Sequence, residues 1–98
     1  MQKLNEMKKL LESKGYTCKK NSFPIFLPKD GRWSLIDLAC FQAHHHPIGI
    51  ELESKNTQQL RNLEGLKEFK RTYPSSNVCQ IFADDTLSKC DLQDLQDL

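Results

Sequence analysis

The sequence contains no apolar run approaching the roughly 20 residues of a membrane-spanning helix, and its first residues form no signal-peptide core. We therefore expect a cytoplasmic protein with no membrane partner. The sequence also lacks a C-x-x-C pair, which argues against a zinc site of the usual spacing. Its four cysteines are Cys18, Cys40, Cys79 and Cys90. Three of them fall in apolar runs, so we expect buried, reduced thiols, with a disulfide between two of them as the alternative.

Net charge is small, +1 over 98 residues, but the charges are unevenly distributed. Residues 1–33 hold eight Lys or Arg against three acids, whereas residues 83–98 hold one Lys against five Asp. A basic front half favours a polyanionic partner such as DNA. The composition, 38% hydrophobic and 28% charged, is that of a globular protein. We expect one domain over 1–98, with a core at about 4–83 and an acidic, leucine-containing tail at 84–98.

Apolar periodicity and turn residues predict six secondary-structure elements. These are a helix over 2–14, a short strand over 16–19, strands over 33–41 and 48–54, a helix over 57–72 and a strand over 78–83. Gly15 should end the first helix, and Pro24 and Pro28 place residues 21–30 in a loop or an irregular edge excursion. A helix between the last two strands permits a parallel crossover. The order α-β-β-β-α-β predicts a small α/β domain with a mixed four-stranded sheet flanked by helices.

Acidic and apolar residues alternate in the stretch that follows Pro47. Because strand side chains switch faces at every residue, Glu51, Glu53 and Lys55 should project from one face. Asp37 lies in the middle of the preceding strand, and a hairpin between the two strands would bring the three acids and the lysine together. A cation would relieve the repulsion between the acids, and carboxylate oxygens suit Mg²⁺ or Mn²⁺.

Asp37 followed by Glu51-Leu-Glu53-Ser-Lys55, in this order of elements, resembles the PD-(D/E)xK nuclease superfamily. The likeness is strongest to the small archaeal Holliday-junction resolvases and other restriction-endonuclease-like proteins, and it covers about residues 4–83. It implies a metal-dependent DNA endonuclease that hydrolyses phosphodiester bonds. Structure-specific cleavage, such as the resolution of DNA junctions, is one form that this activity could take. The implied cofactor is Mg²⁺ or Mn²⁺.

The resemblance also implies roles for individual residues. Asp37 and a glutamate would hold the metal ion, and Lys55 would steady the attacking water or the developing negative charge. Gln58 or Gln59 matches a polar position that family members direct into the site. Asn62 follows one turn later.

The sequence allows two assignments of Glu51 and Glu53 to the E-x-K positions of the family motif. Read as E-x-K, Glu53 and Lys55 fill the family's positions. By the symmetry of the hairpin, Asp37 instead lies opposite Glu51, and Glu51-x-Glu53 fills them. We retain all these residues and rank Asp37 and Glu53 above Glu51.

Four basic residues lead into the strand that carries Asp37, namely Lys19, Lys20, Lys29 and Arg32. Contacts from them to nucleic-acid phosphates and a plain role in solubility are equal alternatives. Because a domain of this size has little surface with which to contact a DNA duplex, we expect a homodimer or a larger complex. The alternative function is a non-catalytic nucleic-acid-binding or protein-interaction module on the same fold, which Ile36 favours because the family commonly has proline there.

Two further features have plainer interpretations. The triplet His44-His45-His46 lacks the spacing of a structural zinc site, and we expect an exposed turn. For Phe23 and Trp33, packing in the core or in a protein interface is favoured over stacking on bases.

Overall fold

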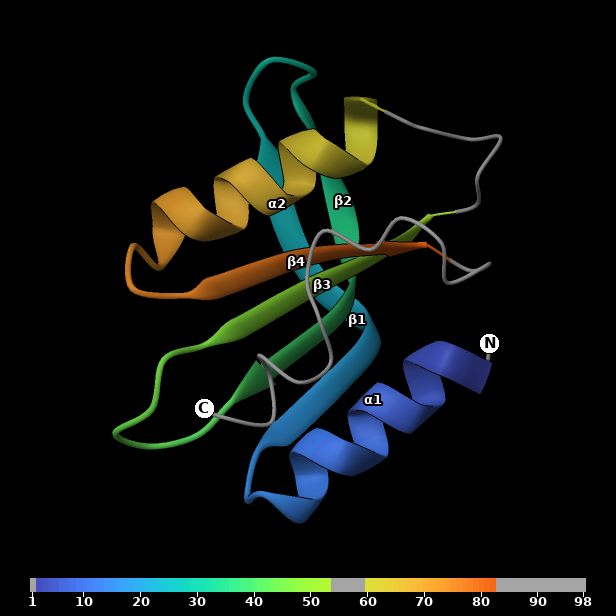
Figure 1. The fold of residues 1–98 in the computed structure, drawn as a ribbon. Helices are drawn as coiled ribbons and strands as arrows, with labels where there is room; N and C mark the ends of the chain where they lie inside the picture. Colours follow the sequence, from blue (N-terminus) through green and yellow to red (C-terminus); the bar gives the residue numbers. More distant parts are fainter. Residues whose placement is uncertain (1, 54–59, 83–98) are drawn as a thin grey trace.

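The structure is a computed structural model that describes residues 2–53 and 60–82. It confirms the α/β class and the order α-β-β-β-α-β. Four strands form one sheet in the order β1-β2-β3-β4, antiparallel except for the parallel pair β3–β4 (Figure 1). The elements are α1 (Gln2–Ser13), β1 (Thr17–Leu27), β2 (Arg32–Phe41), β3 (Ile48–Glu53), α2 (Leu60–Thr72) and β4 (Asn77–Phe82). The predicted tail at 84–98 lies outside the described residues.

The two helices cover opposite faces of the sheet, and each seals its own core. Alternation along β2, β3 and β4 supplies apolar side chains to both faces. The α1-side cluster contains Leu4, Met7, Leu11, Tyr16, Leu38, Cys40, Ile48, Ile50, Cys79 and Ile81. The α2-side cluster contains Ile25, Leu27, Ile36, Ala39 and Phe69, with Phe23, Phe41, Tyr73 and Val78 packed against it. No described helix has the length and apolar character needed to cross a bilayer.

Gly15 ends α1 as predicted. Its φ of +99° lies in the left-handed region that favours glycine. Its amide donates to the Glu12 carbonyl at 3.0 Å, while the Tyr16 amide donates to the Leu11 carbonyl at 3.1 Å. These two bonds form a Schellman motif, and Tyr16 and Leu11 both belong to the α1-side cluster. The motif turns the chain directly into β1.

Strand β1 is longer than the predicted strand over 16–19. Of the two alternatives for residues 21–30, the structure shows an irregular edge strand as far as Leu27 rather than a loop. The ladder with β2 continues through Pro24, which pairs with Leu35, as far as Leu27. Proline is tolerated because β1 is an edge strand, where its missing N–H leaves no ladder bond unmade. A bulge between Lys20 and Phe23 shifts the register by one residue, with Asn21 at φ +53°.

The expectation of reduced thiols is wrong for Cys18 and Cys40, which form a disulfide. They lie directly opposite each other in the β1–β2 ladder, with Cα atoms 4.1 Å apart, a separation close to that of a non-hydrogen-bonded pair. Cys79 is disulfide-bonded as well. Spacing along the chain could not show the pairing, because it depends on the register between two strands.

The far ends of β1 and β2 form a two-stranded arm, residues 23–27 and 32–36, which extends past the point where β3 pairs with β2. Figure 1 shows this hairpin rising behind α2 to the top of the molecule. Helix α2 packs against one face of the arm. Strand β2 therefore leaves the four-stranded sheet partway along its length, and Asp37 lies at that point.

Candidate functional site

Asp37 is held at the junction between the sheet and the arm. In the described residues β2 pairs with β3 over Leu38–Cys40 and Ile48–Ile50. Continuing that register by one position sets Asp37 opposite Glu51, as the symmetry of the hairpin predicted. The Leu52 amide donates to Asp37 Oδ2 at 2.8 Å. The carboxylate thus takes the place of a backbone carbonyl where the two strands separate, which fixes its position beside the Glu51 segment.

Glu51 is buried beneath α2, with 3% of its surface exposed. Its strand neighbours Ile50 and Leu52 pack with the α1-side cluster, so alternation turns Glu51 to the other face. Helix α2 passes close above it at Gly65, where a Cβ atom would lie 3.5 Å from Glu51 Oε1. On β4 the register partner of Glu51 is Gln80, which is also buried. Carboxylates are seldom buried in a core, so this position is unusual for a purely structural residue.

The structure describes the remaining residues of the predicted site only in part. Glu53 ends β3, and its backbone pairs with Phe82 of β4. Its side chain lies outside the described part of the structure, and so do Lys55, Gln58, Gln59 and the side chain of Asn62. Of the predicted acids, the described residues place Asp37 and Glu51 on adjacent strands, with the Asp37 carboxylate bound to the amide of the residue that follows Glu51.

The donor set limits which metal the site could hold. Among residues 2–53 and 60–82 there is no group of three or more His, Cys, Asp or Glu side chains able to hold a metal ion. A zinc or calcium cage built from described residues is therefore not present. Mg²⁺ commonly takes only one or two carboxylates from the protein and completes its shell with water and phosphate oxygens. Asp37 and Glu51 fit that pattern by the chemistry of their oxygens.

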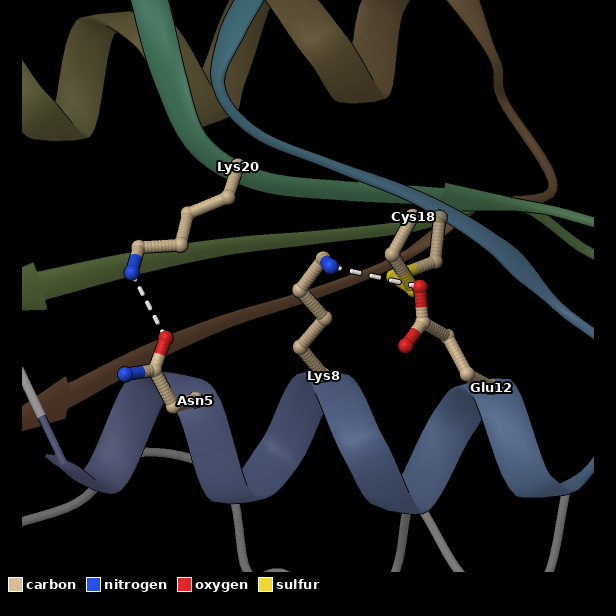
Figure 2. A network of polar contacts seen from close by, with 6 residues as sticks. Asn5, Lys8, Glu12, Cys18 and Lys20 are labelled. Carbon is tan, nitrogen blue, oxygen red and sulfur yellow. Dashed lines mark hydrogen bonds and ion pairs between the residues drawn. A yellow bond between two sulfur atoms is a disulfide. The ribbon is translucent and has the colours of Figure 1, made fainter.

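The structure separates the four predicted nucleic-acid contacts into two groups. Lys19 and Lys20 lie at the base of β1, and Lys20 donates to Asn5 Oδ1 of α1 at 2.6 Å (Figure 2). Lys29 and Arg32 lie at the tip of the arm, where Arg32 forms an ion pair with Asp30 at 3.5 Å. Lys29 also lines a shallow hollow between the arm and α2, together with Glu64 and Glu68. The two groups are roughly 20 Å apart along the strand, so they form no single basic patch.

The histidine triplet forms an exposed turn, as predicted. His44 adopts a φ of +66°, and the His45 amide donates to the Gln42 carbonyl at 3.1 Å. The His45 ring meets the edge of Tyr16, with centroids 5.8 Å apart. The loop lies at the opposite end of β3 from Glu53, so these imidazoles do not belong to the Asp37–Glu51 site. Phe23 packs in the core as expected, whereas Trp33 is 65% exposed.

Sequence reasoning missed two residues that shape the site. Gln80 lies in the middle of the apolar strand β4 and is buried. A polar amide within a run of apolar residues is the signal in the sequence that could have identified it. Gly65 lies in the interior of α2, where glycine is unfavourable by about 1 kcal/mol relative to alanine. Here α2 passes over Glu51 at this glycine, and a Cβ atom would meet Glu51 Oε1 at 3.5 Å, an ordinary contact distance.

No protein-family model, curated protein or solved structure matches the chain. The likeness to the PD-(D/E)xK superfamily therefore depends on the motif residues and the order of the elements.

Proposed function

We propose that the protein is a metal-dependent DNA endonuclease that hydrolyses phosphodiester bonds, with Asp37 and Glu51 as its central acids. The observation that supports this most strongly is the bond from the Leu52 amide to Asp37 Oδ2. It holds one carboxylate next to a second, buried carboxylate at the place where β2 leaves the sheet. Two acids at a strand junction are within the one or two carboxylates by which proteins usually hold Mg²⁺.

In this proposal each residue has a defined role. Asp37 would bind the ion through Oδ1 while the Leu52 amide holds Oδ2 in place, so that the carboxylate is oriented before substrate arrives. Glu51 would supply a second oxygen from beneath α2. Glu53 and Lys55 would act further along the same face, the lysine steadying the attacking water. The ion, when bound, would polarise the scissile phosphate and lower the pKa of a bound water.

The proposal extends to the substrate and the surroundings. DNA would approach from the side where β2 and β3 separate, with Lys19 and Lys29 exposed on either side of the junction. Gln58 or Gln59 would lie at the border of the site, as the resemblance implies. The proposed activity includes the cleavage of branched DNA such as Holliday junctions. A DNA substrate agrees with the cytoplasmic location expected from the sequence, although the disulfide between Cys18 and Cys40 is unusual for that compartment.

A second candidate is a non-catalytic nucleic-acid-binding or protein-interaction module on the same fold. Two features favour it. The described residues contain no group of three metal ligands, and Ile36 precedes Asp37 where the nuclease family commonly has proline.

Cleavage assays with paired variants of Asp37 test the proposal. Wild-type protein should cut supercoiled plasmid or branched DNA with Mg²⁺ or Mn²⁺ and not with EDTA. Asp37→Asn keeps an oxygen that can accept from the Leu52 amide, so stability should change by less than about 0.5 kcal/mol. Asp37→Ala leaves that amide without its acceptor and should cost about 1–2 kcal/mol. Both should lose at least about 100-fold in cleavage, because both lose a charged metal ligand.

Asp30→Asn is the matched control, since it removes the same charge from an exposed position at the tip of the arm. It should leave cleavage unchanged. Full cleavage by Asp37→Asn would overturn the proposal. DNA binding without cutting in every metal condition would support the non-catalytic module instead.

A further inference from the structure

The arm carries an apolar surface on the face turned away from α2. On that face Pro24 pairs with Leu35, and Phe26 pairs with Trp33. The Phe26 and Trp33 rings meet edge to face, with centroids 5.3 Å apart. Exposure reaches 65% for Trp33, 51% for Leu35 and 41% for Phe26. We call these four residues the arm patch.

The arm patch gathers the large hydrophobic side chains that the described structure leaves exposed, namely Phe26, Trp33 and Leu35. The next residues along each strand point the other way and are partly or fully buried under α2, so the arm is covered on one face only. Isolated exposed apolar residues are ordinary, but a contiguous group of this size on a small domain marks an interaction surface.

We infer that the arm patch binds a second copy of this chain, arm against arm, in a two-fold symmetric dimer. The chemistry of the patch excludes charged partners, because none of its four side chains carries a charge. Of the two cations at the tip of the arm, Arg32 is paired with Asp30 and Lys29 lines the hollow between the arm and α2. Phosphates or an acidic peptide would find no counter-charge on this face. An equally apolar surface is the partner that it fits, and each copy supplies one.

The arrangement of the patch suits contact with itself. Phe26 and Trp33 form a row of large side chains, and Pro24 and Leu35 form the adjacent row of smaller ones. A two-fold axis between the rows sets the large row of each copy against the small row of its partner. In such an isologous contact the same surface is used twice. Alternation of large and small side chains is the packing that fills an interface without voids.

The available area agrees with a dimer of moderate strength. The exposed parts of the four side chains amount to roughly 400 Å² per copy, or roughly 800 Å² for two. Specific interfaces start at about 1,000–1,200 Å², so the flanking backbone of the arms must supply the remainder. An interface of that size is smaller than those of obligate dimers, so we expect a dimer that dissociates on dilution.

The position of the patch leaves Glu51 uncovered. Glu51 lies beneath α2, whereas the arm patch faces away from α2. The inference uses none of the proposed catalytic residues, and the mass measurements that test it contain neither DNA nor metal.

Trp33 is the one tryptophan in the sequence, so intrinsic fluorescence reports directly on the patch. Sedimentation equilibrium and Trp33 emission are measured on the full chain from about 1 to 300 µM. The mass should rise from one chain to two. The emission should shift to shorter wavelength over the same concentration range, because the indole leaves water.

Leu35→Lys sets a positive charge from each copy into the interface and should raise the dissociation constant at least about tenfold. Thr17→Lys adds the same charge to an exposed position of β1 outside the arm and should keep the wild-type value. Phe26→Ser is a second patch variant with no added charge, and it should also weaken the dimer. Circular dichroism confirms that each variant is folded, which is expected because these side chains are exposed.

Three results would overturn the inference. The first is a single-chain mass over the whole range. The second is a dimer whose dissociation constant is unchanged in both Leu35→Lys and Phe26→Ser. The third is a monomer whose Trp33 emission is quenched by a single-stranded oligonucleotide, which would assign the patch to base stacking.

Discussion

The two faces of the sheet are built by the same strands, yet they differ in chemistry. The α1-side cluster is apolar and aromatic apart from its cysteines, and the Cys18–Cys40 disulfide packs within it. The α2 side also buries Glu51 and Gln80. Burying polar groups is unfavourable unless they are compensated, so a face that serves only stability has no reason to contain them. The two sides therefore differ in what they bury: the α1 side is built for stability, and the α2 side also holds the polar residues of the candidate site.

The α2 side is itself divided along its length. At one end four rings pack together with centroids 5.1–6.4 Å apart, contributed by Phe23, Phe41, Phe69 and Tyr73. Gly49 lies beneath them, where a Cβ atom would come within 2.7 Å of the Phe69 ring. Glu51 lies two residues further along β3. The aromatic end therefore anchors α2, and the other end leaves room for acids under the same helix.

Removing the anchor on each face should produce the largest effects. Phe69→Ala deletes a fully buried ring and should lower the free energy of unfolding by about 4 kcal/mol. Leu11→Ala on the α1 side should lower it by about 3 kcal/mol. Urea unfolding followed by circular dichroism measures both. A change below about 1 kcal/mol for Phe69→Ala would show that the rings do not anchor α2.

Removing the covalent link should sharpen the contrast between the faces. The disulfide joins residues 22 positions apart, so the Cys18→Ala/Cys40→Ala double variant should lose about 3 kcal/mol through the greater entropy of its unfolded chain. Denaturant unfolding without reductant provides the measurement. An unchanged midpoint, together with two reactive thiols in the wild-type protein, would mean that the bond does not form in solution.

Gly65→Ala tests the space above Glu51. The new Cβ would lie 3.5 Å from Glu51 Oε1 and 3.6 Å from Ile36 Cδ1, which are ordinary contact distances. The substitution should therefore stabilise the helix by about 0.5–1 kcal/mol and raise the melting temperature by several degrees. Gly49→Ala is the matched control and should destabilise, because its Cβ would overlap the Phe69 ring. Destabilisation by both would show that α2 cannot move to accommodate a methyl group.

The smallest effect concerns the pH dependence of the α1 side. Burial raises the pKa of Tyr16 above its ordinary value of 10.0, so the unfolded chain loses this proton at lower pH than the folded protein does. The contribution of Tyr16 to the free energy of unfolding is fully present below pH 10 and is lost as the pH rises through the pKa of Tyr16 in the folded protein. Tyr16→Phe should flatten the decline in stability above pH 10, measured by thermal melts at a series of pH values. An equally steep decline in the variant would assign it to other groups.

Local patterns predicted most of the fold. The helix over 2–14 and the strands over 33–41, 48–54 and 78–83 agree with the structure to within one residue, because each depends on neighbours in the chain. The failures involve contacts across the sheet. Pro24 and Pro28 left a loop and an irregular edge excursion open for residues 21–30, and only the pairing with β2 decided for the edge strand. The cysteines were expected to be reduced, but the register paired two of them.

The candidate site shows the same division. The sequence by itself determined the order of the elements and, through the alternation of side chains, that Glu51 and Glu53 share a face. Hairpin symmetry offered Asp37 opposite Glu51 as one of two alternatives. Only the tertiary structure decided that the Leu52 amide fixes the Asp37 carboxylate and that α2 buries Glu51. The physical reason is range. Periodicity and turns are set by residues close together in the sequence. Strand register and burial are set by contacts between segments that are far apart in the sequence.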